Sequence, residues 1–438
     1  MSKESPIQLN FLRQAMPYIN AHRGKTFVIY LDDKLLAKSN SSSLIHDLAL
    51  VHTLGVKLVL VLGLRQFIDK KLGSENAGTF HDHLRITDRD CINTITEVAG
   101  RVKSDIEAQF SIGLVNTPMS GLKLNTVSGN FVRAKPVGIR SGIDYQFTGE
   151  VRNIATSEIQ HQLESENIVL LTPLGYSKTG DIINLAGIDI AMHAACALQS
   201  EKLILLLDKF KLQTRKKQSD NYYNVHNARE LVNKLPKSKE QTKRYLNIAI
   251  QACLENVKRV HLIDASKSGA LLEELYTLEG VATLITAETY DEIRPATIND
   301  VGGILELIQP LIKKGALVDR SRDQLELEIE NFDIIERDGM VLACGALHTF
   351  PDDNAAEIAC LVVHPKYQFE GRGGKMLKHL EQEAFETGLS NIFLLTTQTA
   401  HWFQEHGFKA TKLEALPVKK QALYNYKRNS KVYLKTLN

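Results

Sequence analysis

The sequence is poor in the residues that mark secreted, metal-binding and membrane proteins. It has five cysteines and one tryptophan among 438 residues. No two cysteines have the spacing of a zinc or redox motif, and an odd, scattered set is typical of reduced thiols. There is no apolar run of about eighteen residues, and the N-terminal residues lack the apolar core of a signal peptide. We therefore expect a cytoplasmic protein with reduced, buried cysteines.

An excess of charge of one sign is also missing. Lys and Arg together number 53, Asp and Glu number 51, and the formal net charge is +2. Proteins that bind nucleic acid or anionic membranes usually carry a basic excess. The balance therefore predicts neither partner. The hydrophobic content of 43% and the length are those of a globular protein with two or three domains.

The first part of the chain alternates buried strands with amphipathic helices. Residues 26–32 and 56–63 are apolar runs of strand length, and residues 41–55 between them have helical spacing, a serine cap and a final glycine. This alternation predicts an open, mainly parallel α/β sheet with helices on both faces. The polar stretch 217–227 is predicted to be a surface loop.

The pattern restarts after a boundary at 284–296. A helix is expected over 299–315, capped by Asn299 or Asp300, and a second helix over 321–332. Residues 332–350 read as a hairpin with Asp338-Gly339 at its turn. A strand at 357–363, a helix to about 387, a strand at 391–397, a short helix around Trp402 and a final strand at 430–437 follow. We place the domains at 1–284 and 293–438, with a linker at 285–292.

A glycine-containing turn joins the strand at 357–363 to the following helix. Lys375 is followed by Met376, so the P-loop pattern fails, and the dinucleotide fingerprint fails as well. The pattern that fits is Gln-x-x-Gly-x-Gly, formed by Gln368, Gly371 and Gly373. Glycines let backbone N–H groups at a helix start approach an anion closely. The turn therefore predicts a site for a pyrophosphate.

This turn, in its element order, resembles the acetyl-CoA loop of the GNAT acetyltransferases, and the resemblance covers about 293–438. It implies a GNAT α/β domain in which the strand ending at Val363 splays from its neighbour and hydrogen-bonds the pantetheine arm of acetyl-CoA. The residues that it assigns to this co-substrate are Leu361, Val362, Val363, Gln368, Glu370, Gly371, Arg372, Gly373 and Gly374.

The whole chain resembles the bacterial two-domain N-acetylglutamate synthases. Matching stretches run along its length, and they include residues 17–29, 84–88, 127–132, 261–283, 320–326, 357–365 and 423–433. The resemblance implies an amino-acid-kinase-like domain followed by the GNAT domain, and acetylation of the α-amine of L-glutamate by direct attack in a ternary complex. It also implies a homo-oligomer, a hexamer built through the kinase-like domain and the N-terminal helix. No metal is implied.

Catalytic and substrate-binding roles carry over by position. Glu357 matches the proposed general base, and Thr396 matches a hydroxyl residue proposed to protonate the thiolate, although its neighbour Thr397 is an alternative. Four further positions match those that hold the glutamate carboxylates: Arg320, Lys419, Arg428 and Ser430. Cationic forks suit a dicarboxylate substrate. Cys360 is interpreted as an interior strand residue rather than a nucleophile.

The first domain departs from a working kinase. Asp32 and Asp33 stand where a kinase has a glycine pair that cradles phosphates. Two carboxylates would repel phosphate, so we expect this domain to be non-catalytic. By resemblance it binds L-arginine as a feedback effector through Tyr18, Glu274, Gly280 and Thr283. Ala282, which replaces a family glycine, and the altered segment after residue 208 bring this sensitivity into question.

Two other functions compete with the synthase. The GNAT domain could act on another small amino acid or on protein lysines, although the basic residues around Arg320 and Arg428 favour a small acidic substrate. The chain could also be a catalytically silent amino-acid sensor, although the intact glycine turn and Glu357 speak against it. A metal site at His81 and His83 is weighed against a loop at a subunit or domain contact, and the loop is favoured.

Overall fold

The computed structural model describes residues 5–38, 41–73, 79–81, 84–112, 124–212, 222–277, 280–287, 292–337, 339–368, 371–426 and 428–437. The chain forms two compact units, residues 1–288 (domain 1) and 289–438 (domain 2). The expected linker at 285–292 meets strands at both ends, because one strand continues to Thr286 and the next begins at Glu292. None of the helices in these ranges combines the length and apolarity needed to cross a bilayer.

Domain 1 is built on an eight-stranded sheet in which one neighbouring pair, β15 with β16, is antiparallel. In sheet order its strands are β14 Tyr222–Asn224, β16 Thr283–Thr286, β15 Arg259–Asp264, β13 Lys202–Leu207, β1 Thr26–Leu31, β2 Lys57–Leu62, β10 Ile168–Leu171 and β5 Thr126–Val127. Every residue of β13 is buried, as expected of a strand covered on both faces. The predicted mainly parallel sheet is confirmed.

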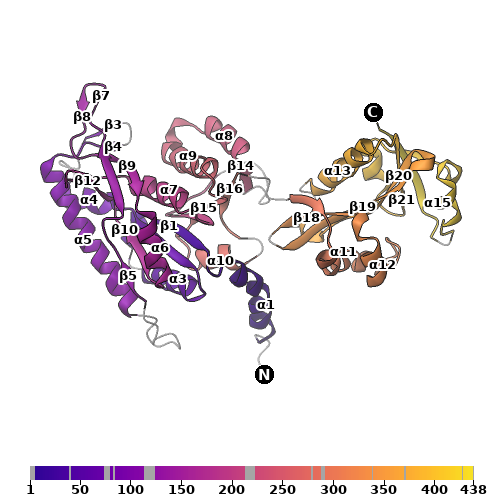
Figure 1. Ribbon diagram of the computed structural model, residues 1–438, viewed down its shortest axis with the longest axis horizontal. Coiled ribbons are helices and arrows are strands. Elements are labelled where there is room, and N and C mark those ends of the chain that lie inside the picture. The colour runs from indigo at the N-terminus through magenta and orange to yellow at the C-terminus, as the bar shows by residue number, and fades with distance from the viewer. Residues whose placement is uncertain are drawn as a thin grey trace. The chain divides into compact units, whose positions relative to one another are not determined.

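Helices cover both faces of this sheet, as Figure 1 shows. The helices are α1 Ser5–His22, α2 Asp33–Leu36, α3 Ser41–Thr53, α4 Arg65–Leu72, α5 Arg89–Ile112, α6 Thr156–Glu164, α7 Gly187–Ala197, α8 Val225–Lys234, α9 Glu240–Leu254 and α10 Ala270–Tyr276. Successive side chains of a strand point to opposite faces. Phe27 and Ile29 therefore join the core under α3, α5 and α10, while Val28 joins the core under α6, α7 and α9.

A smaller sheet and two short hairpins complete domain 1. The smaller sheet has the order β12 Ile182–Asn184, β11 Leu174–Tyr176, β6 Val132–Pro136 and β9 Gly149–Ile154. The hairpins pair β3 Phe80–His81 with β4 Leu84–Arg85, and β7 Ile139–Arg140 with β8 Ile143–Asp144. His81 lies 2.6 Å from the Tyr145 hydroxyl through its Nδ1 atom, whereas His83 lies outside the described residues.

The prediction of a surface loop over 217–227 is wrong for its second half. Residues 222–224 form the edge strand β14, and α8 begins at Val225. The Asn224 side chain accepts a hydrogen bond from the backbone N–H of Asn227 and so caps this helix. The Tyr222 hydroxyl lies 2.9 Å from that of Thr286 on β16, which ties the edge strand to the sheet. Residues 217–221 lie outside the described ranges.

Domain 2 is a seven-stranded sheet with helices on both sides, as Figure 1 shows. In sheet order its strands are β17 Glu292–Pro295, β18 Phe332–Arg337, β19 Met340–Phe350, β20 Ala355–Val363, β21 Asn391–Thr396, β23 Lys431–Thr436 and β22 Lys409–Thr411. Its helices are α11 Val301–Lys313, α12 Arg322–Leu327, α13 Arg372–Glu386, α14 Ala400–Glu405 and α15 Val418–Ala422. Only β20 and β21 pair in parallel within this sheet.

Asp300, one of the two predicted caps, is the N-cap residue of α11, although its side chain forms no capping bond with that helix. Thr297 caps the 3₁₀ turn Ile298–Asp300 that precedes α11. The Asp300 carboxylate reciprocates by accepting from the Thr297 N–H, which forms a capping box. Asp300 also pairs with Arg294, and that guanidinium lowers the pKa of Asp300 to about 2. The cap is therefore one member of an ion-pair network.

Candidate active site

The glycine turn connects β20 to α13. Gly371 has φ +79°, in the left-handed region, and is the residue before the first turn of α13. No side chain in the described residues caps this helix, and its first turn has no acidic residue. The Lys375 N–H donates to the Gly371 carbonyl, whereas the N–H groups in the first turn of a helix generally have no acceptor within the helix itself. The turn therefore offers the start of a fifteen-residue helix to an anion.

Side chains around the turn define its walls. A Cβ added to Gly373 would lie 3.4 Å from the Trp402 ring and 3.6 Å from a Val363 methyl group. The Arg372 side chain is buried, with its guanidinium over the Tyr367 ring, so any contact of Arg372 with a ligand would use its backbone. The exposed Gln368 donates to the Val363 carbonyl at 3.3 Å. Glu370 lies outside the described residues.

The strand β20 parts from β21 after Glu357. The parallel pairing joins Ala355, Ala356 and Glu357 to β21 and then stops, while β20 continues to Val363. On the other side, β20 stays paired with β19, where Val362 lies opposite Cys344 and Val363 opposite Ala343. The far half of β20, including Leu361, therefore has an edge that pairs with no strand in the part of the chain that the structure describes. This is the opening that a splayed GNAT strand requires.

A β-bulge lies in β20 three residues beyond its last pair with β21. Cys360 and Leu361 together oppose Gly345 of β19, and Cys360 has φ +49°. An extra residue bends its strand and re-aims the side chains on either side of it. The Cys360 side chain is buried, and its sulfur accepts a hydrogen bond from Arg320 Nη1 at 2.7 Å. Burial raises the pKa of this thiol despite the nearby guanidinium, so it is not a thiolate nucleophile.

Glu357 is a buried carboxylate with two basic neighbours. Its side chain is 8% exposed, and Oε2 lies 2.7 Å from Lys420 Nζ. His348 lies directly across the β19–β20 ladder, where facing side chains are in contact distance. Burial lowers the pKa of His348 even though Glu357 opposes the shift, so the imidazole is neutral at pH 7. A carboxylate beside a neutral imidazole is a suitable acceptor for a proton.

Two guanidinium groups, those of Arg320 and Arg428, lie near Cys360. Arg320 contacts Cys360 and lies 3.6 Å from Glu328, and Arg428 donates to the Ala316 carbonyl. Burial, followed by the charge of Arg320, lowers the pKa of Arg428, which indicates that the two cations are neighbours. Ser430 is buried, and its carbonyl accepts from the Tyr424 hydroxyl at 2.7 Å. The structure therefore brings predicted carboxylate-binding cations close to Cys360, three residues from Glu357.

The two neighbouring lysines of α15 have different surroundings. Lys419, which the sequence assigned to the substrate, forms a 3.5 Å pair with Asp352, and both side chains are largely exposed. Lys420 contacts Glu357, as described above. His348 and Lys420 are thus functional candidates that sequence reasoning missed. His348 could have been found from the strand register, whereas no motif separates the two lysines.

Thr396 lies at the end of β21 and is buried, whereas Thr397 is exposed. The Thr396 hydroxyl accepts from the N–H groups of Gln398 at 3.3 Å and Thr399 at 3.2 Å. These bonds cap the turn into α14, and the hydroxyl also lies 3.1 Å from Thr399 Oγ1, a contact in which either oxygen can be the donor. Its position is consistent with the predicted role as a proton donor, which stays a prediction.

Domain 1 brings the predicted effector residues near one another. Glu274 Oε1 lies 2.6 Å from His261 Nδ1, and Oε2 accepts from the N–H groups of Val281 and Ala282 at 2.6 and 2.7 Å. Burial opposes ionisation, but these bonds lower the pKa of Glu274 overall. Gly280 has φ +58°, and a Cβ there would lie 2.5 Å from Glu274 Oε2. This position therefore requires glycine.

The remaining effector positions lie around this carboxylate. Ala282 has no left-handed backbone, so the replacement of a glycine there causes no strain. Thr283 is buried at the start of β16. Tyr18 of α1 contacts His22, which in turn bonds the Leu275 carbonyl of α10 at 3.0 Å. The N-terminal helix is thus packed beside the helix that carries Glu274, while arginine binding stays a prediction.

Two aspartates lie at helix starts near the beginning of domain 1. Asp32 accepts from the Lys34 N–H and caps α2, and the Asp33 carboxylate accepts from the Gln66 N–H at the start of α4. A Cβ on Gly63 would lie 2.6 Å from the Tyr30 hydroxyl, so this side chain fills the space beside it. Burial, with a hydrogen bond in which the protonated Asp33 carboxyl donates to Asp32, raises the pKa of Asp33 to about 7. The chain's own carboxylates occupy the helix starts that would bind phosphate in a kinase.

Comparison with known proteins agrees with this architecture. Residues 25–264 match the amino acid kinase family, and residues 305–408 match the acetyltransferase (GNAT) family. An amino-acid acetyltransferase of Serratia proteamaculans is 41% identical over the full length of both chains. Two structures of N-acetylglutamate synthase from Neisseria gonorrhoeae are 34% identical and cover 98% of this chain and 99% of theirs. The TM-score is 0.89 for the complex with coenzyme A and L-arginine, and 0.63 for the complex with coenzyme A and N-acetyl-glutamate.

The fold and the site define an acetyltransferase whose GNAT domain follows an amino-acid-kinase-like domain. The chain belongs to the family of bacterial two-domain N-acetylglutamate synthases, and it is an amino-acid acetyltransferase.

Proposed function

We propose that the enzyme transfers the acetyl group of acetyl-CoA to the α-amine of L-glutamate, the first step of arginine biosynthesis. The observation that carries the proposal is the group of cations, Arg320, Arg428 and Lys420, near the buried Glu357 where β20 parts from β21. Several fixed cations suit a substrate with two carboxylates. The N-acetyl-glutamate bound to the gonococcal relative supports the same substrate.

Acetyl-CoA is proposed to bind along domain 2. The N–H groups of Gly371, Arg372, Gly373 and Gly374 would receive the pyrophosphate, because the helix start there has no side-chain cap. The unpaired edge of β20 from Leu361 to Val363 would hydrogen-bond the pantetheine arm. Gln368 and Glu370 would complete the loop. The coenzyme A in the gonococcal structures supports this assignment.

The reaction is proposed to be a direct attack. Glu357 accepts the proton of the α-ammonium, through water or through His348, and the free amine then attacks the thioester carbon. Thr396 donates its proton to the departing thiolate of CoA and regains one from the nitrogen, which loses its second proton as the amide forms. A positioned base of this kind typically contributes about 10²- to 10⁴-fold to a rate. The raised pKa of the Cys360 thiol supports transfer without an acyl-cysteine intermediate.

The substrate carboxylates are proposed to bind Arg320, Arg428 and Ser430, with a lysine of α15 as a further cation. The resemblance assigns that lysine as Lys419, and its neighbour Lys420 has the contact with Glu357. Substrate binding would compete with Glu357 for the Lys420 ammonium. The two assignments predict different effects on kcat/KM when Lys419 or Lys420 is replaced.

Regulation and assembly are proposed from the family. L-Arginine would bind domain 1 at Tyr18, Glu274, Gly280 and Thr283 and act as a feedback effector on a cytoplasmic homo-oligomer, a hexamer. The L-arginine in the gonococcal structure supports an effector of this kind. Light scattering of the purified protein measures the oligomer size.

The function is tested by measuring CoA release from acetyl-CoA with each common amino acid, with and without L-arginine. Turnover that requires glutamate and falls with arginine supports the catalytic and the regulatory proposals together. Turnover on glutamate that arginine leaves unchanged retains the synthase and contradicts the effector site. Turnover on another amino acid contradicts the substrate, and acetyl-CoA binding without any turnover indicates the alternative, a silent sensor.

A further inference from the structure

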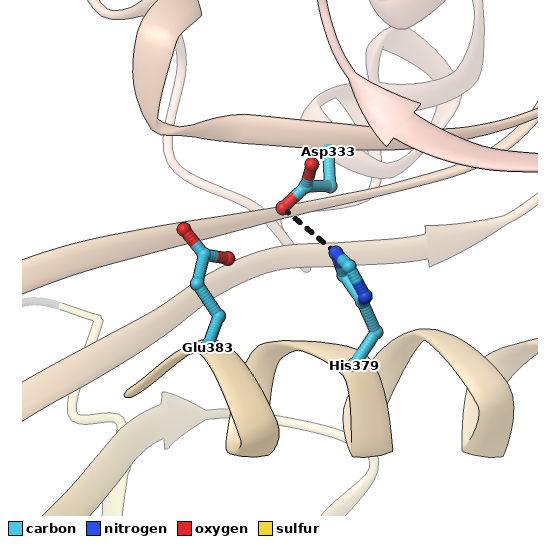
Figure 2. A group of neighbouring side chains, drawn as sticks. All are labelled: Asp333, His379 and Glu383. Carbon is cyan, nitrogen blue, oxygen red and sulfur yellow. Dashed lines mark ion pairs between the residues drawn. The ribbon is translucent and has the colours of Figure 1, made fainter. Parts of the chain in front are cut away.

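Three metal-ligating side chains converge between α13 and β18, on residues that the proposed reaction does not use. Asp333 comes from β18, and His379 and Glu383 come from successive turns of α13. Figure 2 shows the histidine and the glutamate rising from the helix toward the aspartate on the strand. One donor atom from each residue lies within 4.8 Å of the others. Among the described residues, this is the only such group of three.

The spacing is close to that of a metal-ligand set. Nitrogen and oxygen ligands lie about 2.0–2.2 Å from Zn²⁺, so two tetrahedral ligands are about 3.4 Å apart. Asp333 Oδ2 and His379 Nε2 are 3.4 Å apart. The Asp333 side chain is 10% exposed, whereas the His379 side chain is 38% exposed. An ion there could therefore be reached from solvent and keep water in its remaining positions.

The group contains two carboxyl groups and one imidazole, so a bound cation would balance the negative charge of its carboxylates. No Lys or Arg in the described ranges forms an ion pair with Asp333 or Glu383, and His379 is the one basic partner recorded there. Glu383 Oε2 is buried, and no hydrogen-bond partner for it lies among the described residues. Two carboxylates facing one another in a half-buried site are stabilised by a shared ion.

We propose that Asp333, His379 and Glu383 bind one divalent transition-metal ion of the Zn²⁺ type. An imidazole nitrogen favours Zn²⁺ over Mg²⁺ and Ca²⁺, which select oxygen ligands. The site is structural, because it clamps α13 onto β18. The glycine turn immediately precedes α13, so the ion fixes the helix whose start receives the anion in the proposed acetyl-CoA site.

The test is titration of tag-free, chelator-treated full-length enzyme with ZnCl₂ by calorimetry, with a thermal melt at each metal concentration. The expected result is one Zn²⁺ per chain and a melting temperature that rises with Zn²⁺. His379→Ala and Glu383→Gln each weaken binding at least tenfold and abolish the rise. Circular dichroism and acetyl-CoA binding without added metal confirm that each variant folds.

Matched controls separate this site from adventitious binding. His401→Ala removes a histidine of α14 that is 91% exposed, and Glu386→Gln removes a nearby carboxylate of α13 outside the ligand set. Both retain the wild-type affinity and melting shift. The proposal is overturned if wild type binds no Zn²⁺, if the two ligand variants bind it as tightly as wild type, or if MgCl₂ gives the same affinity and stabilisation.

Discussion

The two domains use the start of a helix after a strand in opposite ways. In domain 1, the carboxylates of Asp32 and Asp33 accept from N–H groups at the starts of α2 and α4. In domain 2, Gly371 precedes α13 without a side chain, and no described side chain caps the helix. In the first arrangement, carboxylates of the chain accept hydrogen bonds from the N–H groups at the helix start. In the second, these N–H groups are left for a ligand. The identity of one or two residues at a turn thus decides whether a fold keeps a phosphate site.

The sharpest test of this contrast exchanges one carboxylate in each domain for its amide. Glu357→Gln removes the proposed base, and we expect kcat to fall about 10²- to 10⁴-fold. Asp33→Asn keeps the shape of a group that only fills a helix start, and we expect kcat within twofold of wild type. Steady-state CoA release measures both. Retention of activity by Glu357→Gln, with loss in Asp33→Asn, would reverse the assignment of the catalytic domain.

The lysines of α15 give the next largest effect. Lys420→Met leaves the buried Glu357 without its ammonium partner, and we expect kcat/KM for glutamate to fall about 10- to 100-fold, as for the loss of one partner of a buried ion pair. Lys419→Met removes a solvated pair with Asp352, and such pairs contribute little. Its kcat/KM is expected to stay within twofold. The opposite ranking would assign substrate binding to Lys419.

The carboxyl pair of domain 1 predicts a pH-dependent stability. The pKa of Asp33 is about 7 in the fold against an ordinary value of 3.8, so the fold favours the protonated form. The contribution of Asp33 to the free energy of unfolding therefore falls as pH rises from about 4 to about 7, and it does not change further above about 7. Asp33→Asn removes this loss, and we expect the variant to be more stable than wild type by an amount on the order of 2 kcal/mol at pH 8.

The measurement is denaturant unfolding of both proteins at pH 4.5 and pH 8, followed by a probe of domain 1. The difference between wild type and variant should be small at the lower pH and large at the higher one. An equal difference at both values would show that Asp33 is ionised in the fold across this range.

The smallest expected effect concerns the glycine turn itself. Gly371→Ala forces a side chain into the left-handed region at a cost of about 1–2 kcal/mol, although nothing lies within 4 Å of the added carbon. We expect the Kd for acetyl-CoA to rise up to about tenfold. Gly388→Ala imposes the same left-handed strain just past the other end of α13, also with nothing within 4 Å of the added carbon, and it serves as the matched control. Equal affinities for the two variants would argue against a phosphate contact at this turn.

Much of the fold could be predicted from the sequence, because the patterns that indicate its strands and helices are local and recur along the chain. Buried runs such as residues 56–63 and the glycine turn before α13 each identify an element and its neighbours. The parting of β20 from β21 could also be predicted, because the GNAT resemblance implies a splayed strand. In the structure the pairing of the two strands ends at Glu357. The place of the candidate site in the fold could therefore be predicted, while the roles of its residues stay predictions.

Other features depend on packing that no local pattern reports. β14 has three residues and is fixed by its pairing with β16 and by Tyr222 on Thr286, so its sequence looks like polar loop. Which lysine of the five-residue helix α15 reaches Glu357 depends on how that helix is rotated. Asp333 and His379 are distant in sequence and meet only because α13 packs on β18.

The unpaired half of β20 has a consequence for the lifetime of the enzyme in a cell. An uncovered strand edge presents a row of backbone donors and acceptors to any other extended chain. If the pantetheine arm hydrogen-bonds this edge, acetyl-CoA acts as a surrogate strand that completes the sheet. Ligand that binds the native state also stabilises it in proportion to the logarithm of its concentration. Cells short of acetyl-CoA would then hold a synthase that is both idle and more prone to self-association.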